Sequence, residues 1–233
     1  DVTGVQTCAL PILQSTIKCT SLKMSRRRKL VVFDMDSTLI DQEVIDLLAQ
    51  HANVEVEVSE ITRQAMAGKI DFEESLRSRV KLLRGLPISA IEAVRNEITL
   101  TNGAVELIDY ILANGHVPAV VSGGFTSVIK SILEDLGIKY FMANELATKD
   151  GYITGEISSA VVDRKAKAVF LKEYSDKEGI NIEDSIAIGD GANDIDMVQS
   201  AGIGIAFCAK DPLKEVADEI IDIRDLREVI KFI

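Results

Sequence analysis

Short apolar runs alternate with segments of helical pattern over most of the chain. An apolar run bounded by polar residues predicts a strand that is buried on both faces of a parallel sheet. Such runs lie at residues 30–33, 116–121, 140–143, 185–189, 203–207 and 219–223. Apolar residues at helical spacing predict helices over residues 104–112, 125–136 and 163–178, another from about residue 193, and a closing helix. Strands that alternate with helices predict an α/β protein with a doubly wound parallel sheet and right-handed crossovers.

A block of four short helices without a strand interrupts this alternation directly after the first strand. It spans residues 42–99, and Gly85-Leu86-Pro87 separates its last two helices. Ligands of open α/β sheets bind outside the carboxyl ends of the strands, so an insert at this point can cover the site. We therefore expect a core of residues 24–41 and 100–233 and a small helical cap of residues 42–99. Residues 145–157 of the core predict a β-hairpin.

The first 23 residues do not share the pattern of the rest. A secretory signal carries its basic residues before its apolar stretch, whereas here residues 26–29 are basic and come after it. A transit peptide is a better match, because residues 15–28 are rich in Ser, Thr and basic residues and contain no acid. Residues 2–12 also resemble the translation of a sequencing-library adapter joined to a genuine reading frame. We favour this last explanation, with Met24 as the natural start and residues 1–23 as a non-native or disordered leader.

Composition and net charge exclude some classes of protein and disfavour some kinds of binding partner. The chain has 233 residues, 47% of them apolar and 27% charged, which is the mix of an ordinary globular protein. Its net charge of −11 disfavours nucleic acid and anionic membrane surfaces as partners. The longest apolar run, residues 201–209, is far shorter than the roughly 20 residues of a membrane span. Outside the leader Cys208 is the single cysteine, which suits a reducing compartment. We expect a soluble cytoplasmic protein, a monomer or homodimer, that acts on a small molecule.

Polar residues follow three of the predicted core strands. The three segments are Asp34-Met35-Asp36-Ser37-Thr38, Ser122-Gly123-Gly124 and Gly189-Asp190-Gly191-Ala192-Asn193-Asp194. The carboxyl ends of parallel strands meet at one edge of a sheet, so four carboxylates gather there. Carboxylates so close repel one another unless a cation lies between them, and an all-oxygen donor set indicates Mg²⁺. The glycines let backbone N–H groups approach a phosphate, and Lys167, on the helix predicted over residues 163–178, supplies a point charge. Together these groups indicate phosphoryl transfer through an acyl phosphate.

The order and spacing of these motifs resemble those of the haloacid dehalogenase superfamily. Asp34-x-Asp36-x-Thr38, then Ser122, Lys167 and Gly189-Asp190-x-x-x-Asp194, stand in the order of its four motifs. The chain is more closely similar to the phosphoserine phosphatases within that superfamily, in residues 33–39, 72–80, 121–125 and 189–194. The similarity extends from Leu30 to the C-terminus. It implies a Rossmann-like core with an inserted helical cap.

The resemblance implies a role for each residue at the edge of the sheet. Asp34 would be the nucleophile that forms an aspartyl phosphate, and Asp36 the general acid and base. The side chains of Asp34 and Asp190 and the backbone carbonyl of Asp36 would hold Mg²⁺, with Asp194 supporting its water ligands. The groups that would bind the phosphate are Ser122, Gly123, Lys167 and Asn193.

The resemblance also implies that the cap selects the substrate. Arg79 would bind a carboxylate through two parallel hydrogen bonds, and Glu43 would bind an ammonium group. Met66 and Phe72 would close an apolar lid over the site. The expected reaction is the Mg²⁺-dependent hydrolysis of O-phospho-L-serine to L-serine and phosphate, the last step of L-serine biosynthesis.

Two alternatives remain open on the sequence alone. The first is a related phosphatase or phosphotransferase that acts on another small phosphomonoester; a substrate without a carboxylate would leave Arg79 unused. The second is a phosphate-binding module that has lost turnover. The intact pair of Asp34 and Asp36 argues against it, because binding alone needs no acid and base at that position.

Overall fold

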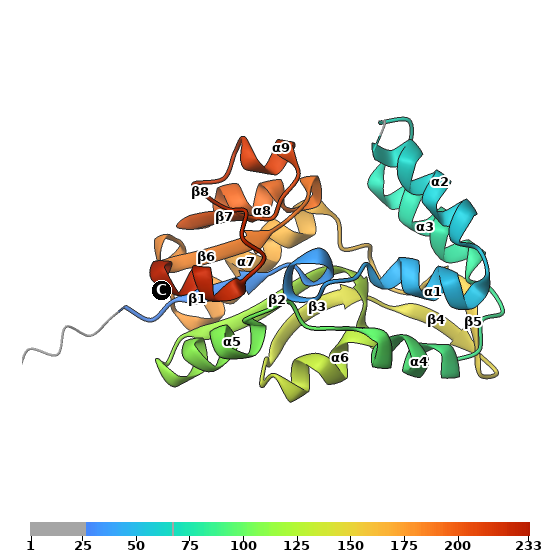
Figure 1. The fold of residues 1–233 in the computed structure, drawn as a ribbon, viewed down its shortest axis with the longest axis horizontal. Coiled ribbons are helices and arrows are strands. Elements are labelled where there is room, and N and C mark those ends of the chain that lie inside the picture. Colours follow the sequence, from blue (N-terminus) through green and yellow to red (C-terminus); the bar gives the residue numbers. More distant parts are fainter. Residues whose placement is uncertain (1–26, 67) are drawn as a thin grey trace, which may run out of the picture.

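The computed structural model describes residues 27–66 and 68–233, and in Met66 it describes the backbone only. The leader predicted over residues 1–23 and the proposed start at Met24 lie outside these residues. A parallel sheet of six strands in the order β3-β2-β1-β6-β7-β8 forms the centre of the fold (Figure 1). The predicted α/β class with a doubly wound parallel sheet is confirmed. The strands are β1 (Leu30–Phe33), β2 (Val117–Phe125), β3 (Tyr140–Asn144), β6 (Ser185–Gly189), β7 (Ile203–Phe207) and β8 (Glu219–Ile221).

Strand β1 lies in the middle of the sheet and is buried on both faces. It pairs with β2 on one side, where Leu30 lies opposite Val117, and with β6 on the other, where Leu30 lies opposite Ser185. The chain moves outward to β2 and β3 and then returns to the far side of β1 through β6. A doubly wound sheet opens a crevice at the carboxyl ends of its strands where the order reverses in this way. The residues that follow β1 and β6 therefore meet at this crevice.

Alternate residues of β1 belong to two separate cores, because side chains along a strand point to opposite faces. Val31 and Phe33 lie in the core beneath α5 (Ala104–Ala113) and α6 (Thr126–Asp135). Leu30 and Val32 lie in the core beneath α7 (Arg164–Glu178), α8 (Ile195–Ser200) and α9 (Asp211–Lys214). Each β1 residue is fully buried, which explains why this strand reads as one unbroken apolar run.

Four helices lie between β1 and α5, as the pattern of residues 42–99 predicts. They are α1 (Val44–Ala52), α2 (Glu55–Met66), α3 (Phe72–Leu82) and α4 (Ser89–Glu97). The predicted hairpin, β4 (Leu146–Lys149) and β5 (Tyr152–Ile157), lies beside them rather than on the main sheet (Figure 1). Its β5 strand pairs with the segment that joins α3 to α4, since the N–H of Gly85 donates to the Ile153 carbonyl at 2.9 Å.

The two connections into and out of the helical insert run side by side. The N–H of Asp41 donates to the Thr99 carbonyl at 3.0 Å, and the N–H of Thr101 donates to the Leu39 carbonyl at 3.0 Å. Arg224, beyond β8, adds a hydrogen bond from Nε to Oδ1 of Asp41 at 2.9 Å. These hydrogen bonds hold the two connections together where the insert meets the sheet.

Three elements differ in detail from the sequence prediction. Strand β2 continues through Ser122 to Phe125, so the polar Ser-Gly-Gly segment lies inside its last part. Strand β8 ends at Ile221, and the closing helix, Leu226–Phe232, is a 3₁₀ helix. None of the described helices combines the length and apolar character that crossing a membrane requires.

Candidate active site

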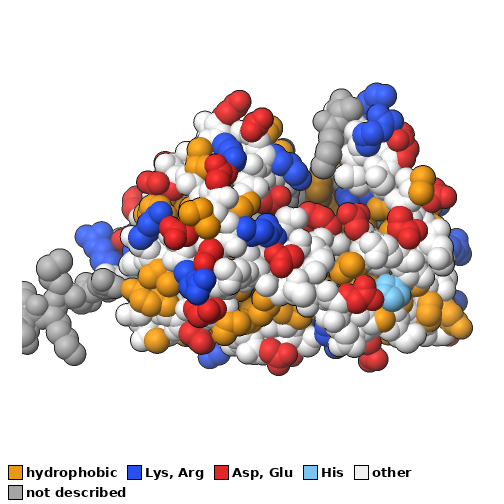
Figure 2. Space-filling model, in the orientation of Figure 1, with side chains coloured by type: hydrophobic (Ala, Val, Ile, Leu, Met, Phe, Trp, Pro, Cys, Tyr) orange, Lys and Arg blue, Asp and Glu red, His pale blue; other side chains and the backbone are white. Residues whose placement is uncertain are grey.

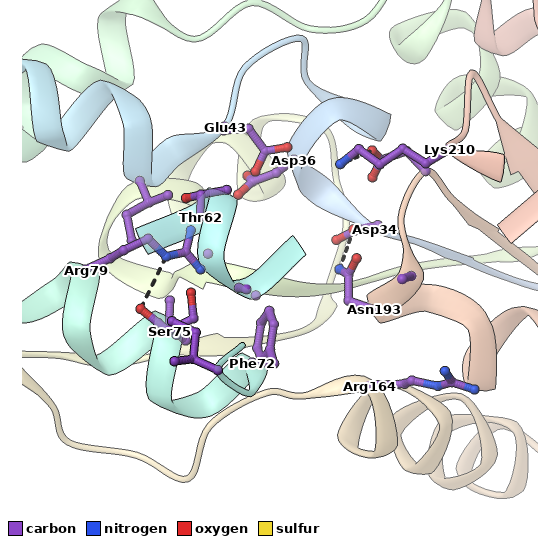
Figure 3. A pocket seen from close by; sticks show the side chains of 18 residues that line it. Asp34, Asp36, Glu43, Thr62, Phe72, Ser75, Arg79, Arg164, Asn193 and Lys210 are labelled. Carbon is purple, nitrogen blue, oxygen red and sulfur yellow. Dashed lines mark hydrogen bonds and ion pairs between the residues drawn. The ribbon is translucent and has the colours of Figure 1, made fainter. Parts of the chain in front are cut away.

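A cavity of about 460 Å³ lies between the carboxyl ends of the strands and helices α2 and α3. Figure 2 shows the molecule hollowed between the part that carries α8 and α9 and these two helices. Its walls come from segments far apart in the sequence, as Figure 3 shows. Among the lining residues are Asp34, Asp36, Asp190 and Asn193 from the sheet side and Phe72 and Arg79 from the insert.

The turn after β1 presents two carboxylates to this cavity. Oδ1 of Asp34 accepts a hydrogen bond from the N–H of Met35 at 2.7 Å, which fixes the first carboxylate at the end of the strand. Asp36 has φ −66° and ψ 135°, and Ser37 has φ 57° and ψ 2°. These are the central angles of a type II turn. Oδ1 of Asp36 is buried and has no hydrogen-bond partner among the described residues.

Lys167 joins two of the acidic segments. Its Nζ lies 2.8 Å from Oδ1 of Asp34 and 2.7 Å from Oδ1 of Asp194, and its side chain is fully buried. Oδ2 of Asp194 accepts hydrogen bonds from the N–H groups of Asp190 at 3.2 Å and Gly191 at 3.1 Å. The loop after β6 therefore holds Asp194 in place, and Asp194 in turn helps to position the ammonium group of Lys167.

Burial and mutual repulsion raise the pKa of three carboxyl groups at the site. The pKa of Asp34 lies well above its ordinary value because of burial and Asp194, although Lys167 opposes the shift. Burial, Glu43 and Asp34 raise the pKa of Asp36 in the same way. Burial and Asp194 raise the pKa of Asp190 to about 6. Each of these groups therefore holds a proton more tightly than an exposed carboxyl group does.

Burial acts to lower the pKa of Lys167, but the Asp194 and Asp34 carboxylates outweigh it and keep the pKa above its ordinary value. Lys167 is therefore a permanent positive charge at the bottom of the site.

Three of the carboxylates form a cluster that could hold a metal ion. Asp34, Asp190 and Asp194 each offer one oxygen, and these oxygens lie within 4.8 Å of one another. A buried set of oxygen donors without a nitrogen or sulfur ligand fits a hard divalent cation such as Mg²⁺. Such an ion would also offset the repulsion that raises the pKa values of these groups.

The predicted phosphate-binding groups lie on the sheet side of the cavity and differ in how deeply they are buried. Gly123 lines the cavity, and a Cβ at its position would meet the Phe72 ring at 3.3 Å. Ser122 is fully buried, and its Oγ accepts a hydrogen bond from the N–H of Gly124 at 2.8 Å. Asn193 donates from Nδ2 to Oδ2 of Asp34 at 3.4 Å (Figure 3).

The predicted substrate-selecting residues of the insert lie opposite. Glu43 accepts a hydrogen bond from the Ser37 hydroxyl at 2.7 Å. Arg79 donates from Nε to the Ser75 carbonyl at 3.3 Å, one turn earlier on α3, and its guanidinium group lies in the cavity wall (Figure 3). Burial lowers the pKa of Arg79, opposed by Asp46, Glu43 and Asp36. Met66 ends helix α2, and its side chain lies outside the described part of the chain.

Two basic residues that line the cavity were not predicted. Nζ of Lys210 lies 3.9 Å from Oδ2 of Asp190, and Arg164 donates from Nε to Oδ1 of Asp196 at 2.6 Å. Lys210 could have been inferred from the sequence, because it lies just beyond the carboxyl end of β7, at the same edge of the sheet as the acidic segments. Arg164 lies one turn before Lys167 on α7, a spacing that places two residues on one face of a helix.

Comparison with known proteins gives consistent results. Residues 31–199 match the family of haloacid dehalogenase-like hydrolases. The chain is 50% identical to a phosphoserine phosphatase of Methanocaldococcus jannaschii over 210 residues, which cover 90% of this chain and all of that protein. It is 48% identical to a phosphoserine phosphatase of Lactococcus lactis, with 88% of this chain and 94% of that protein covered.

Solved structures show the same relationship. A substrate-bound phosphoserine phosphatase superposes with a TM-score of 0.85 at 50% identity, covering 89% of this chain and 99% of the other. A phosphoserine phosphatase with an analogue of the phospho-aspartyl intermediate superposes with a TM-score of 0.84, also at 50% identity, covering 89% of this chain and 100% of the other.

Proposed function

The chain belongs to the haloacid dehalogenase-like hydrolases, and from this premise we propose that it hydrolyses O-phospho-L-serine to L-serine and phosphate. One observation carries the proposal. The carboxylates of Asp34 and Asp36 share one cavity with a guanidinium group, Arg79, and a further carboxylate, Glu43. The first pair suits transfer of a phosphoryl group, and the second suits an amino acid, which carries a carboxylate and an ammonium group.

The contacts of Asp34 indicate which of its oxygens attacks. Oδ1 is bound by the N–H of Met35 and by Lys167, whereas Oδ2 faces Asn193. In the first step Oδ2 forms a bond to phosphorus, and the bond between phosphorus and the serine oxygen breaks. Asp36 gives its proton to that oxygen. The products of this step are L-serine and an aspartyl phosphate on Asp34.

The second step reverses the role of Asp36. Its carboxylate takes a proton from a water molecule, the water oxygen bonds to phosphorus, and the bond to Asp34 breaks to release phosphate. The raised pKa of Asp36, due to burial and to Glu43 and Asp34, supports this role, because a group that starts as an acid must carry a proton when substrate binds. Proton transfer of this kind contributes about 10²–10⁴-fold to a rate.

We propose Mg²⁺ as the cofactor, held by the side chains of Asp34 and Asp190 and the carbonyl of Asp36, with Asp194 supporting its water ligands. When bound, the ion would offset the negative charge of the phosphate and of the carboxylates around it. Lys167 would bind a phosphate oxygen and stabilise the charge that shifts onto it in the transition state. The phosphate contacts are completed by Ser122, Gly123 and Asn193.

The insert provides substrate selection in this proposal. Arg79 binds the serine carboxylate, and a substrate that lacks the carboxylate cannot make this contact with the half-buried guanidinium group, which disfavours its binding. Glu43 binds the ammonium group, while Phe72 and Met66 cover the site. Residues 42–99 thus act as a cap over a core formed by residues 24–41 and 100–233. We place this activity in the cytoplasm, in a monomer or homodimer.

Phosphate release tests the proposal directly. The purified chain is assayed with O-phospho-L-serine and with phosphoethanolamine, which lacks the carboxylate, in Mg²⁺ and after chelation. We expect a strong, Mg²⁺-dependent preference for phosphoserine, and no release by the Asp34→Asn variant. Equal rates on the two esters would leave a phosphatase with a different substrate. No release from either would favour a phosphate-binding module.

A further inference from the structure

Ser37 adopts a backbone conformation that favours glycine. It follows Asp36 in the turn after β1, and its φ of 57° places it in the left-handed region. This is the third position of a type II turn, where glycine or asparagine is usual because a Cβ crowds the backbone. A serine at this position destabilises the turn, and such local strain is typical of sites where a side chain has a function.

The hydroxyl group of Ser37 has a specific partner. Its Oγ donates to Oε1 of Glu43 at 2.7 Å, and this contact is partly buried at the edge of the cavity. The other contacts of Ser37 use its backbone. Its N–H donates to the Gln42 carbonyl at 3.2 Å, and its carbonyl accepts from Nη1 of Arg224 at 3.2 Å. A glycine at this position would keep both backbone contacts and would lose the one to Glu43.

The start of helix α1 offers the Glu43 carboxylate an alternative position. It is the N-cap residue of α1, yet its side chain makes no hydrogen bond to the N–H groups at the start of that helix. The positive end of a helix dipole at its N-terminus attracts a carboxylate. The hydrogen bond from Ser37 holds the Glu43 carboxylate at the cavity instead.

We propose that Ser37 is a positioning residue for substrate selection: its hydroxyl holds Glu43 in the orientation that receives the ammonium group of the substrate. The proposal rests on the proposed function. It explains why a serine, rather than a glycine, occupies this strained position of the turn. It assigns Ser37 no contact with the reacting phosphate. Its effect falls on the discrimination between esters that carry an ammonium group and esters that do not.

The Ser37→Gly variant of the full chain separates this role from a purely structural one. It removes the hydroxyl and relieves the strained φ. Values of kcat/KM are measured for O-phospho-L-serine and for 3-phosphooxypropanoate, the same molecule without its amino group. We expect the ratio of the two values to fall about tenfold in S37G, mainly through a higher KM for phosphoserine, because a hydrogen bond to a charged group is lost. Urea unfolding should show that S37G is at least as stable as the wild-type chain.

Two controls sharpen the result. S37A lacks the hydroxyl but keeps the Cβ, so it should lose the same discrimination and be less stable than S37G. In a Glu43→Ala background, S37G should cause no further fall in the ratio, because the two residues act through one contact.

An unchanged ratio in S37G would overturn the proposal, whether both kcat/KM values stay at the wild-type level or fall equally; an equal fall would indicate a general role in the turn. Failure of the wild-type chain to hydrolyse phosphoserine is a separate result that would overturn the proposed function itself.

Discussion

Nζ of Lys167 lies 2.8 Å from Oδ1 of Asp34, and the side chains of both residues are almost completely buried. Asp194 approaches the same ammonium group from the loop after β6. One positive charge is therefore held between two carboxylates that are almost completely buried. Such an arrangement is stable only while every member is present, because each charge compensates the burial of the others.

Replacement of Lys167 by Met tests this interdependence. The change leaves Asp34 and Asp194 buried without a counter-charge, so we expect the free energy of unfolding to fall by about 3 kcal/mol in the presence of a chelator. Urea unfolding measures the loss, and Mg²⁺ should recover part of it in the same variant. Turnover should fall at least about 100-fold, because a group that stabilises transition-state charge is gone. Wild-type stability of K167M in chelator would contradict this account.

The raised pKa of Asp190 predicts a pH dependence of stability in the metal-free protein. Burial and Asp194 raise this pKa to about 6 from an ordinary value of 3.8, so the folded state binds the proton more tightly than the unfolded state does. The resulting stability is fully present below pH of about 4 and is lost as the pH rises through about 6, by about 3 kcal/mol.

Unfolding in urea between about pH 4 and pH 7.5, with chelator, measures this decline. Saturating Mg²⁺ should flatten it, since the cation binds the ionised carboxylate in the folded state. Asp190→Asn removes the titrating group and should show a shallower decline than the wild-type chain. The same pH slope in D190N would mean that other groups cause the decline.

The part of the site at the sheet edge could be predicted because it follows from strand order. A buried apolar run that ends in Asp34 and a second that ends before Asp190 place both carboxylates at the carboxyl edge of a parallel sheet. The structure shows these two strands as neighbours, with the N–H of Asp34 donating to the Ile188 carbonyl at 2.9 Å. The local sequence pattern was sufficient to predict this part of the site, because the carboxyl ends of paired parallel strands lie at the same edge of the sheet.

The remaining contacts depend on tertiary packing that no local pattern contains. The β4–β5 hairpin was predicted from its turn, but its pairing with Gly85 of the insert was not. Lys210 and Arg164 line the cavity although neither belongs to a motif residue set, and the direction of the Ser122 hydroxyl, toward the N–H of Gly124, depends on the path of β2. The predicted roles of the site residues stay predictions until variants are assayed.

Arg79→Lys tests whether the guanidinium group selects the substrate. Lysine keeps the positive charge but cannot form two parallel hydrogen bonds to one carboxylate, so we expect kcat/KM for phosphoserine to fall about 100-fold. The rate with phosphoethanolamine, which has no carboxylate, should change far less. Steady-state kinetics with the two esters measure the difference. An equal loss on both would show that Arg79 supports the fold of the insert rather than substrate recognition.

Gly189→Ala tests the packing that holds Asp194. A Cβ at Gly189 would lie 2.4 Å from Cγ of Asp194, so the carboxylate must move away from Lys167 and from the N–H groups of Asp190 and Gly191. We expect a loss of about 1–3 kcal/mol in the free energy of unfolding, together with weaker stabilisation by Mg²⁺. Gly123→Ala is the matched control for stability, because its Cβ would meet only the Phe72 ring, at 3.3 Å. Both quantities are read from urea unfolding with and without Mg²⁺. If G189A responds to Mg²⁺ as the wild-type chain does, then the position of Asp194 does not control the metal site.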